Sequence, residues 1–201
     1  MICSRHKPTK GHTMKQDKQD IRVTLRGIRP IMFDRYAGDN KTQLPPEQKL
    51  YFAADGESLV LPSTNIMSFL SAENTTSAPK ISYDPRKYKA VCQALRGFVT
   101  IEPWLIPILR DGEPIRFQGF GQNGITLHRS VARLAKGVPN PKERPLVDMP
   151  WSVSFTMTLW PNDDISVVEL SNIVERGGIA LGLGTYRGVY GKFVVDQWDV
   201  G

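Results

Sequence analysis

Hydrophobic and polar residues alternate along two segments of the chain, and each alternation predicts a strand with one buried face. Residues 21–26 alternate isoleucine, valine and leucine with arginine and threonine, and residues 152–159 alternate serine and threonine with large apolar residues. Neighbouring side chains of a strand point to opposite faces, so one set enters the core and the other set faces away from it. Arg22 and Arg26 are therefore expected to share the outer face of the first strand.

Two other segments have the spacing of amphipathic helices. Apolar residues within 88–95 recur at positions i, i+3, i+4 and i+7, just after an Asp-Pro pair that suits a helix start. Ser166 and Glu169 have the spacing of a capping box at the start of a second helix. The glycine pair at 177–178 is expected to end that helix.

Shorter apolar runs predict four more strands, and Asp55-Gly56 predicts a hairpin turn. These strands are expected near residues 98–101, 105–109, 125–134 and 192–198. The order of elements fits an α+β fold with helices on one face of an antiparallel sheet. Strands near 21, 98, 153 and 192, with helices near 85 and 166, give a ferredoxin-like core of the kind found in RRM and RAMP proteins, with hairpin insertions. Such a sheet keeps one helix-free face.

Composition places these elements in one domain of residues 21–201, preceded by a basic tail of residues 1–20. The chain has 201 residues, of which 40% are hydrophobic, a size and composition typical of a single globular domain. The tail lacks periodicity and large apolar residues, which predicts disorder. With two cysteines and no run of about 18 apolar residues, we expect a reduced, cytoplasmic protein without a membrane span.

The positive charge is concentrated in two places. The net charge is +6, while residues 1–20 alone carry +3 and residues 129–144 carry +4, so the remainder is slightly negative. This pattern favours a polyanionic partner. A solvated tail and a solvated loop are the alternative interpretation.

A glycine-rich segment at residues 182–193 is the first candidate site. Four glycines in ten residues permit close approach to a ligand, and amides in such loops can bind a phosphate. Arg187 and Lys192 would add charge, and Tyr186, Tyr190 and Phe193 would offer rings on which bases stack. The alternative is a turn whose aromatic residues fill the core. The spacing matches neither a P-loop nor a dinucleotide-binding fingerprint.

A basic segment at residues 127–136 is the second candidate site. Arg129 and Arg133 have the parity of one strand face, Lys136 follows them, and together with the first strand they could form a positive stripe that binds phosphates. The alternative is a charged solvent face. His128 is a weak candidate for the general base of a metal-independent RNase. No metal-binding motif occurs, and no metal or cofactor is expected.

The end of the chain resembles a family of small phage and prophage proteins that finish with the pattern G-[IL]-G-x-x-R-x-x-[YF]-G-[RK]-F. The segment LPSTNIMSFL and the Pro-Trp pair before the second alternating strand also fit, so the resemblance extends from about residue 60 to the end. A glycine-rich loop late in a ferredoxin-like fold is also similar to RAMP-superfamily proteins, the RNA-gripping backbone subunits of CRISPR effectors. The residues that match the phage pattern are Gly182, Gly184, Arg187, Tyr190, Gly191, Lys192 and Phe193.

These observations predict a non-enzymatic protein of phage or mobile-element origin that binds single-stranded RNA or DNA. Assembly into a homo-oligomer along the strand is part of this expectation. It requires the glycine-rich segment and the arginine-bearing strands to converge on one cationic surface. The alternatives are a phage structural or protein-interaction role, and an RNA endonuclease that uses His128.

Overall fold

The alternating segment that starts near residue 21 becomes the central strand of an antiparallel sheet. The computed structural model describes residues 18–39, 41–72, 75–133 and 139–201. Strands of the core lie in the order β10-β1-β9-β4, and every neighbouring pair is antiparallel. With α3 and α4 this is the ferredoxin-like α+β fold that the sequence predicts. The core elements are β1 (Gln19–Gly27), α3 (Tyr88–Phe98), β4 (Val99–Glu102), β9 (Ser152–Leu159), α4 (Val167–Ala180) and β10 (Phe193–Val200).

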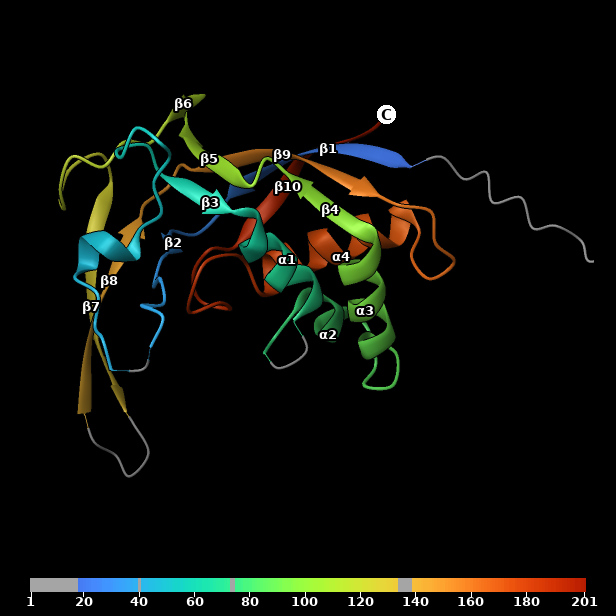
Figure 1. The fold of residues 1–201 in the computed structure, drawn as a ribbon, viewed down its shortest axis with the longest axis horizontal. Helices are drawn as coiled ribbons and strands as arrows, with labels where there is room; N and C mark the ends of the chain where they lie inside the picture. The colour runs from blue at the N-terminus through green and yellow to red at the C-terminus, as the bar shows by residue number, and fades with distance from the viewer. Residues whose placement is uncertain (1–17, 40, 73–74, 134–138) are drawn as a thin grey trace, which may run out of the picture.

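The sheet continues beyond this core, and helices cover only one of its faces. Strand β9 pairs with β4 along one half and with β5 (Leu105–Arg110) along the other. Strands β3 (Val60–Pro62) and β6 (Glu113–Pro114) pair with β5. Helices α1 (Ser63–Ser71), α2 (Ala78–Ser82), α3 and α4 lie below the sheet in Figure 1 and leave the upper face free. None of the described helices is long and apolar enough to cross a membrane.

Burial in the central strands follows the alternation. Ile21, Val23 and Leu25 are at most 1% exposed and face the helices, while Arg22 and Arg26 are exposed. Burying such apolar side chains is the main contribution to the stability of a domain of this size.

A second, three-stranded sheet projects beside the helical layer as a long hairpin (Figure 1). Its order is β2 (Ile31–Met32), β8 (Pro139–Val147), β7 (Ile125–Arg133), and the short 3-10 helix η1 (Pro46–Lys49) packs against β8. The sequence predicts β7 and the existence of hairpin insertions, but β8 was not expected to be a strand.

The prolines of β8 explain why a strand there goes unrecognised. Pro139, Pro141 and Pro145 share one parity, and the carbonyl oxygen of Pro145 accepts the N–H of Phe33 next to β2. In an antiparallel strand the N–H and C=O of one residue point to the same side. The missing N–H groups of all three prolines therefore face away from β7, where they cost no hydrogen bond of that ladder.

Arg110 joins the root of the hairpin to the main sheet. Its guanidinium donates to the carbonyl oxygens of Pro150 (3.0 Å), Asp148 (2.7 Å) and Asn123. These carbonyls belong to the turn before β9 and the turn before β7. One side chain thus donates to three main-chain carbonyl groups that take no part in strand pairing.

A partly buried cluster of charges holds the outer side of the hairpin. Asp34 accepts from Arg144 on β8 at 2.7 Å and lies 3.3 Å from the Lys49 ammonium. Lys49 is only 8% exposed, and it also donates to the carbonyl oxygen of Glu143 at 2.7 Å. Asp34 is thus the carboxylate that balances two cations with little access to water.

Helix α4 packs so closely on its neighbours that two of its positions require glycine. A Cβ at Gly177 would lie 2.5 Å from the Cβ of Ala78, and a Cβ at Gly178 would lie 2.6 Å from the ring of Phe193. The helix continues through both residues to Ala180. The expectation that the glycine pair ends the helix is therefore wrong, because these glycines serve close packing. The capping box of Ser166 and Glu169 is confirmed.

Replacing Asp34 by alanine is expected to destabilise the protein by about 2–4 kcal/mol, because Lys49 and Arg144 would be left without their counter-ion in a poorly hydrated site. Urea unfolding measures the change. Asp196→Ala, which breaks the exposed ion pair with Arg26, is the matched control and should cost about 0–1 kcal/mol. Equal losses for the two variants would contradict the role given to Asp34.

Two glycine-to-alanine substitutions in helices are expected to have opposite effects. Gly178→Ala forces a methyl group against Phe193 and should destabilise the protein by about 1–3 kcal/mol. Gly97→Ala in α3 meets no atom within 4 Å and should stabilise by about 0.5 kcal/mol through the loss of glycine's unfolded-state entropy. Thermal unfolding of both variants measures the change in stability. A Gly178→Ala variant as stable as the parent would contradict the close packing of α4 on Phe193.

Candidate nucleic-acid interface

The glycine-rich segment leads from α4 to β10 and is bound along its length to β2 and α1. The N–H of Gly184 donates to the side-chain oxygen of Asn65 (2.9 Å), and that of Thr185 donates to the carbonyl oxygen of Met32 (2.8 Å). The N–H of Gly191 donates to the carbonyl oxygen of Pro30 at 2.7 Å. These bonds place the segment beside the hairpin, on the helix side of the main sheet (Figure 1).

Three of the four glycines of this segment serve contacts within the chain. A Cβ at Gly182 would lie 2.5 Å from the main chain of Gly191, and a Cβ at Gly184 would lie 2.5 Å from the carbonyl oxygen of Met32. Within residues 182–191, every N–H except those of Tyr186 and Arg187 donates to another residue of the chain. The expectation that the amides of this loop cradle a phosphate is therefore wrong for all but two of them, because the fold itself uses the others.

Aromatic rings line up from this segment to the hairpin. The rings of Tyr186 and Tyr190 lie 5.9 Å apart at 35°, and the ring of Tyr190 meets His128 of β7 at 5.6 Å in an edge-to-face contact. Tyr186 is 62% exposed, and its φ of 53° turns the main chain sharply at this residue. Tyr190 and His128 are half-buried, so the row ends in one exposed ring, and exposed rings can stack with bases. The alternative, in which the aromatic residues of this segment fill the core, holds for Phe193, which is fully buried, but not for Tyr186.

Two cations flank the aromatic row. Arg187 is half-buried, and this desolvation lowers the pKa of its guanidinium. Its side chain donates to the hydroxyl of Thr75 at 3.3 Å, and no described carboxylate lies within ion-pair distance of it or of Lys192. A guanidinium stays protonated in a protein. A half-buried guanidinium without a counter-ion favours an anionic ligand.

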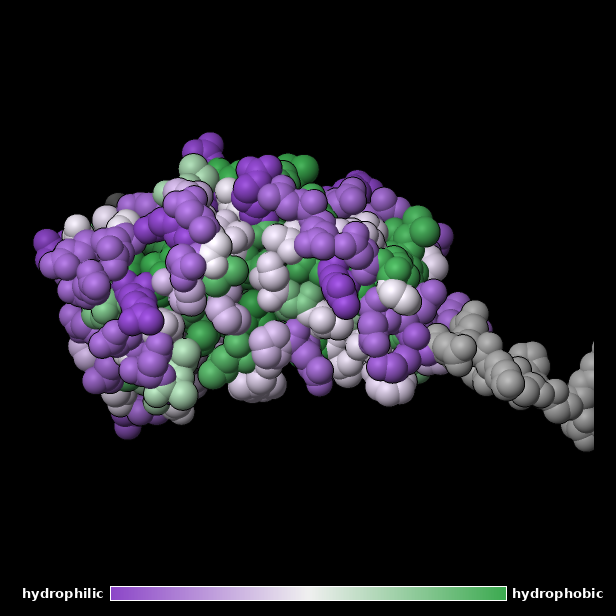
Figure 2. Space-filling model, turned by 90° about the horizontal axis from the view of Figure 1, so that it is seen from above, coloured by the Kyte–Doolittle hydropathy of each residue, from purple (hydrophilic) through white to green (hydrophobic). Residues whose placement is uncertain are grey.

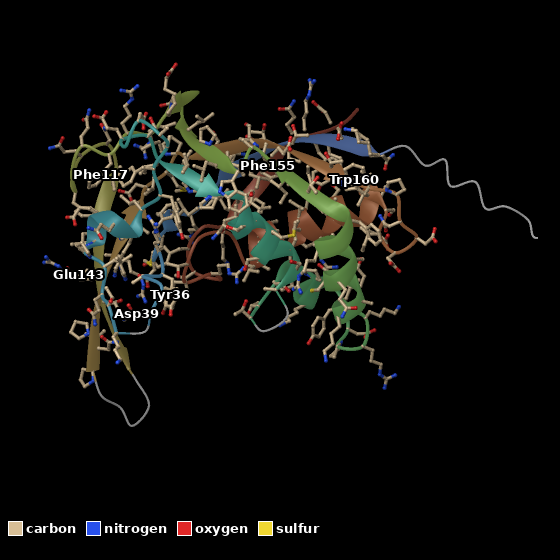
Figure 3. All side chains as sticks on the ribbon, viewed as in Figure 1. Tyr36, Asp39, Phe117, Glu143, Phe155 and Trp160 are labelled. Carbon is tan, nitrogen blue, oxygen red and sulfur yellow. The ribbon has the colours of Figure 1, made fainter. Side chains whose placement is uncertain are left out.

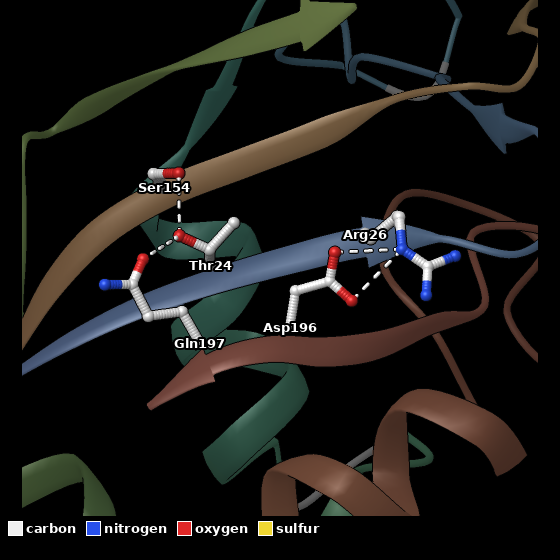
Figure 4. Close-up of polar contacts among 5 residues, drawn as sticks. All are labelled: Thr24, Arg26, Ser154, Asp196 and Gln197. Carbon is white, nitrogen blue, oxygen red and sulfur yellow. Dashed lines mark hydrogen bonds and ion pairs between the residues drawn. The ribbon is translucent and has the colours of Figure 1, made fainter. Parts of the chain in front are cut away.

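Arg22 and Arg26 lie on the other side of the sheet from this row. The Nε of Arg26 donates to both carboxylate oxygens of Asp196, at 3.0 and 2.9 Å, and the hydroxyl of Thr24 bonds Ser154 and Gln197 beside it (Figure 4). Seen from this side, the molecule has a mostly hydrophilic surface (Figure 2). Acidic side chains share this surface: Asp20, Glu102, Asp196 and Asp199. Arg22 lies across from Asp199 in the strand register.

Arg129 of the hairpin is also separated from the aromatic row. Arg129 forms an exposed ion pair with Glu143 at 2.8 Å, and it follows His128 directly, so the two side chains point to opposite faces of β7. Arg133 pairs with Pro139 through the main chain, but its side chain, and Lys136 entirely, lie outside the described residues.

The expectation that all the predicted residues converge on one cationic surface is therefore wrong. Strand alternation separates Arg22 and Arg26 from the helix side, and it separates Arg129 from His128. The structure brings together the rings of His128, Tyr186 and Tyr190, and two cations, Arg187 and Lys192, are their close neighbours in the sequence. We call these five residues the aromatic row with its cations. Among the described residues, no group of three or more histidine, cysteine or acidic side chains is placed to hold a metal ion.

Comparison with known proteins gives a match in fold only. No protein-family model and no curated protein matches this sequence. Among solved structures, the chain is similar to one from the "Cryo-EM structure of the Type III-B Cmr-beta bound to cognate target RNA", with a TM-score of 0.54 and 11% identity. The match covers 91% of this chain but only 60% of the other. At this identity the likeness is one of fold, and at that level it agrees with the RAMP resemblance.

Proposed function

We propose that this protein binds single-stranded RNA without cleaving it. Bases stack on Tyr186, Tyr190 and His128, while Arg187 and Lys192 neutralise phosphates. The observation that carries the proposal is the aromatic row, with Tyr186 exposed at its end, next to a half-buried arginine that has no carboxylate partner among the described residues.

Two further considerations support a single strand and RNA. Aromatic rings can stack only with bases that are not already stacked in a duplex, so an aromatic row favours single-stranded regions. The fold is like that of a chain from a complex bound to target RNA, which supports RNA over DNA as the ligand.

Binding without catalysis is the better proposal for His128. A histidine that acts as general base is usually oriented by a hydrogen bond to a second side chain. The imidazole of His128 packs edge-to-face on Tyr190 and has no hydrogen bond to another described residue. Its surroundings therefore favour stacking over proton transfer.

A protein-interaction role is a second candidate for the helix-free face. There, Arg26 is paired with Asp196, and Thr24, Ser154 and Gln197 form a hydrogen-bonded group. Paired charges and small hydroxyl side chains suit a protein surface better than a phosphate backbone.

Two matched arginine variants test the RNA site by fluorescence anisotropy with a labelled single-stranded RNA at several salt concentrations. Arg187→Gln removes one phosphate contact, so the negative slope of log affinity against log salt should become shallower by about 0.7. Arg22→Gln removes the same charge from the helix-free face and should leave the slope unchanged. The proposal fails if the parent protein does not bind, and a slope lowered only by Arg22→Gln would place the RNA on the opposite face.

Removing the exposed ring should weaken binding with little effect on the salt slope. Tyr186→Asn suits this purpose because asparagine tolerates a positive φ. We expect the affinity to fall by about 5- to 100-fold, the range for loss of one base stack. Tyr186→Phe keeps the ring and should bind like the parent; an equal loss in both variants would indicate that stacking is not what this residue supplies.

A further inference from the structure

A cleft of about 780 Å³ lies between residues 34–46 and strand β8 and takes no part in the site described above. Tyr36 and Asp39 line it from one side, and Lys142 and Glu143 line it from the other. Figure 3 shows Tyr36, Asp39 and Glu143 at this end of the molecule, next to the hairpin.

The carboxylates of the cleft are already engaged. Asp34 is bound by Lys49 and Arg144, and Glu143 is paired with Arg129. Asp39 accepts the N–H groups of Lys41 and Thr42 and the Thr42 hydroxyl, and these hydrogen bonds, led by the hydroxyl, lower the pKa of its carboxyl. Asp34 and Glu143 are thus balanced by cations, while Asp39 stays ionised and keeps its negative charge at the edge of the cleft.

Two cations of the cleft have no carboxylate partner among the described residues. These are Arg35, whose guanidinium lies 5.5 Å from the centre of the Tyr51 ring, and Lys142 on β8. The side chain of Tyr36 beside them is 63% exposed. An exposed ring close to unneutralised cations matches the two parts of a nucleotide, its base and its phosphate.

The cleft adjoins the aromatic row across the hairpin. Lys142 is directly opposite Ser130 in the register, and Ser130 is two residues from His128. Residues that are opposite each other, or two apart, share a face of a sheet. Lys142 and His128 therefore lie on one face of the hairpin as diagonal neighbours, whose Cα atoms are typically about 7–8 Å apart.

We propose that this cleft is a second nucleotide subsite, in which Tyr36 stacks on a base and Lys142 and Arg35 bind phosphate. A single strand held by the aromatic row continues over the hairpin into the cleft. This inference rests on the proposed function and deepens it, because it gives the site a length and a direction.

The test compares a short single-stranded RNA of about 4 nucleotides with a long one of about 12. The double variant Tyr36→Ala/Lys142→Gln should bind the long RNA about 5- to 100-fold more weakly, while its affinity for the short RNA stays that of the parent. The single variant Tyr36→Phe keeps the ring and should bind the long RNA like the parent. Lys89→Gln, an exposed charge change on α3, is the control and should affect neither.

Photocross-linking of the parent protein gives a second readout that needs no variant. A long RNA with 4-thiouridine at one end should cross-link to the peptide that contains Tyr36. In the separate binding experiment, Tyr186→Asn should weaken binding of both RNAs. If the double variant binds both RNAs like the parent and no cross-link reaches this peptide, the second subsite is refuted while the aromatic row stands. If the parent binds neither RNA, both proposals fail.

Discussion

A backbone contact between Leu183 and Gly191 determines where the rings of Tyr186 and Tyr190 can lie. The N–H of Leu183 donates to the carbonyl oxygen of Gly191 at 2.9 Å, and a Cβ at residue 191 would lie 1.9 Å from the carbonyl oxygen of Leu183. Only glycine permits this approach. The contact closes the segment into a loop, and Tyr186 and Tyr190 lie between its two ends. The same glycines that suggest a ligand cradle thus act by shaping the loop that presents the rings.

Strand alternation then distributes the charges of the molecule over separate surfaces. Ile21, Val23 and Leu25 must face the helices to be buried, and this forces Arg22 and Arg26 to the far side of the sheet. There, Asp196 pairs with Arg26 and lowers the local positive charge. The net charge of +6 therefore says little about where a polyanion could bind, because its value ignores which face each cation occupies.

The sequence was sufficient for the core of the fold because its signals are local. Alternation at 21–26 and 152–159 and the capping box at Ser166 each lie within one element, and the structure has those elements. Strand β8 was missed because a strand tolerates proline only where the missing N–H group needs no partner. Which side of β8 meets this condition depends on how β2 and β7 pair with it, and the sequence alone does not show that pairing. The contact between Tyr190 and His128 joins residues distant in sequence, so periodicity could not reveal it. Nor could it reveal the cleft at Tyr36, which exists only once residues 34–46 lie against β8.

The two attachments of the hairpin differ in chemistry. Asp34 holds its outer side through a carboxylate that lies between two cations. Arg110 holds its root through a guanidinium that donates to three neutral carbonyl groups. The attachment of the hairpin root to the main sheet therefore rests on neutral acceptors, and only the outer side of the hairpin depends on a balance of opposite charges.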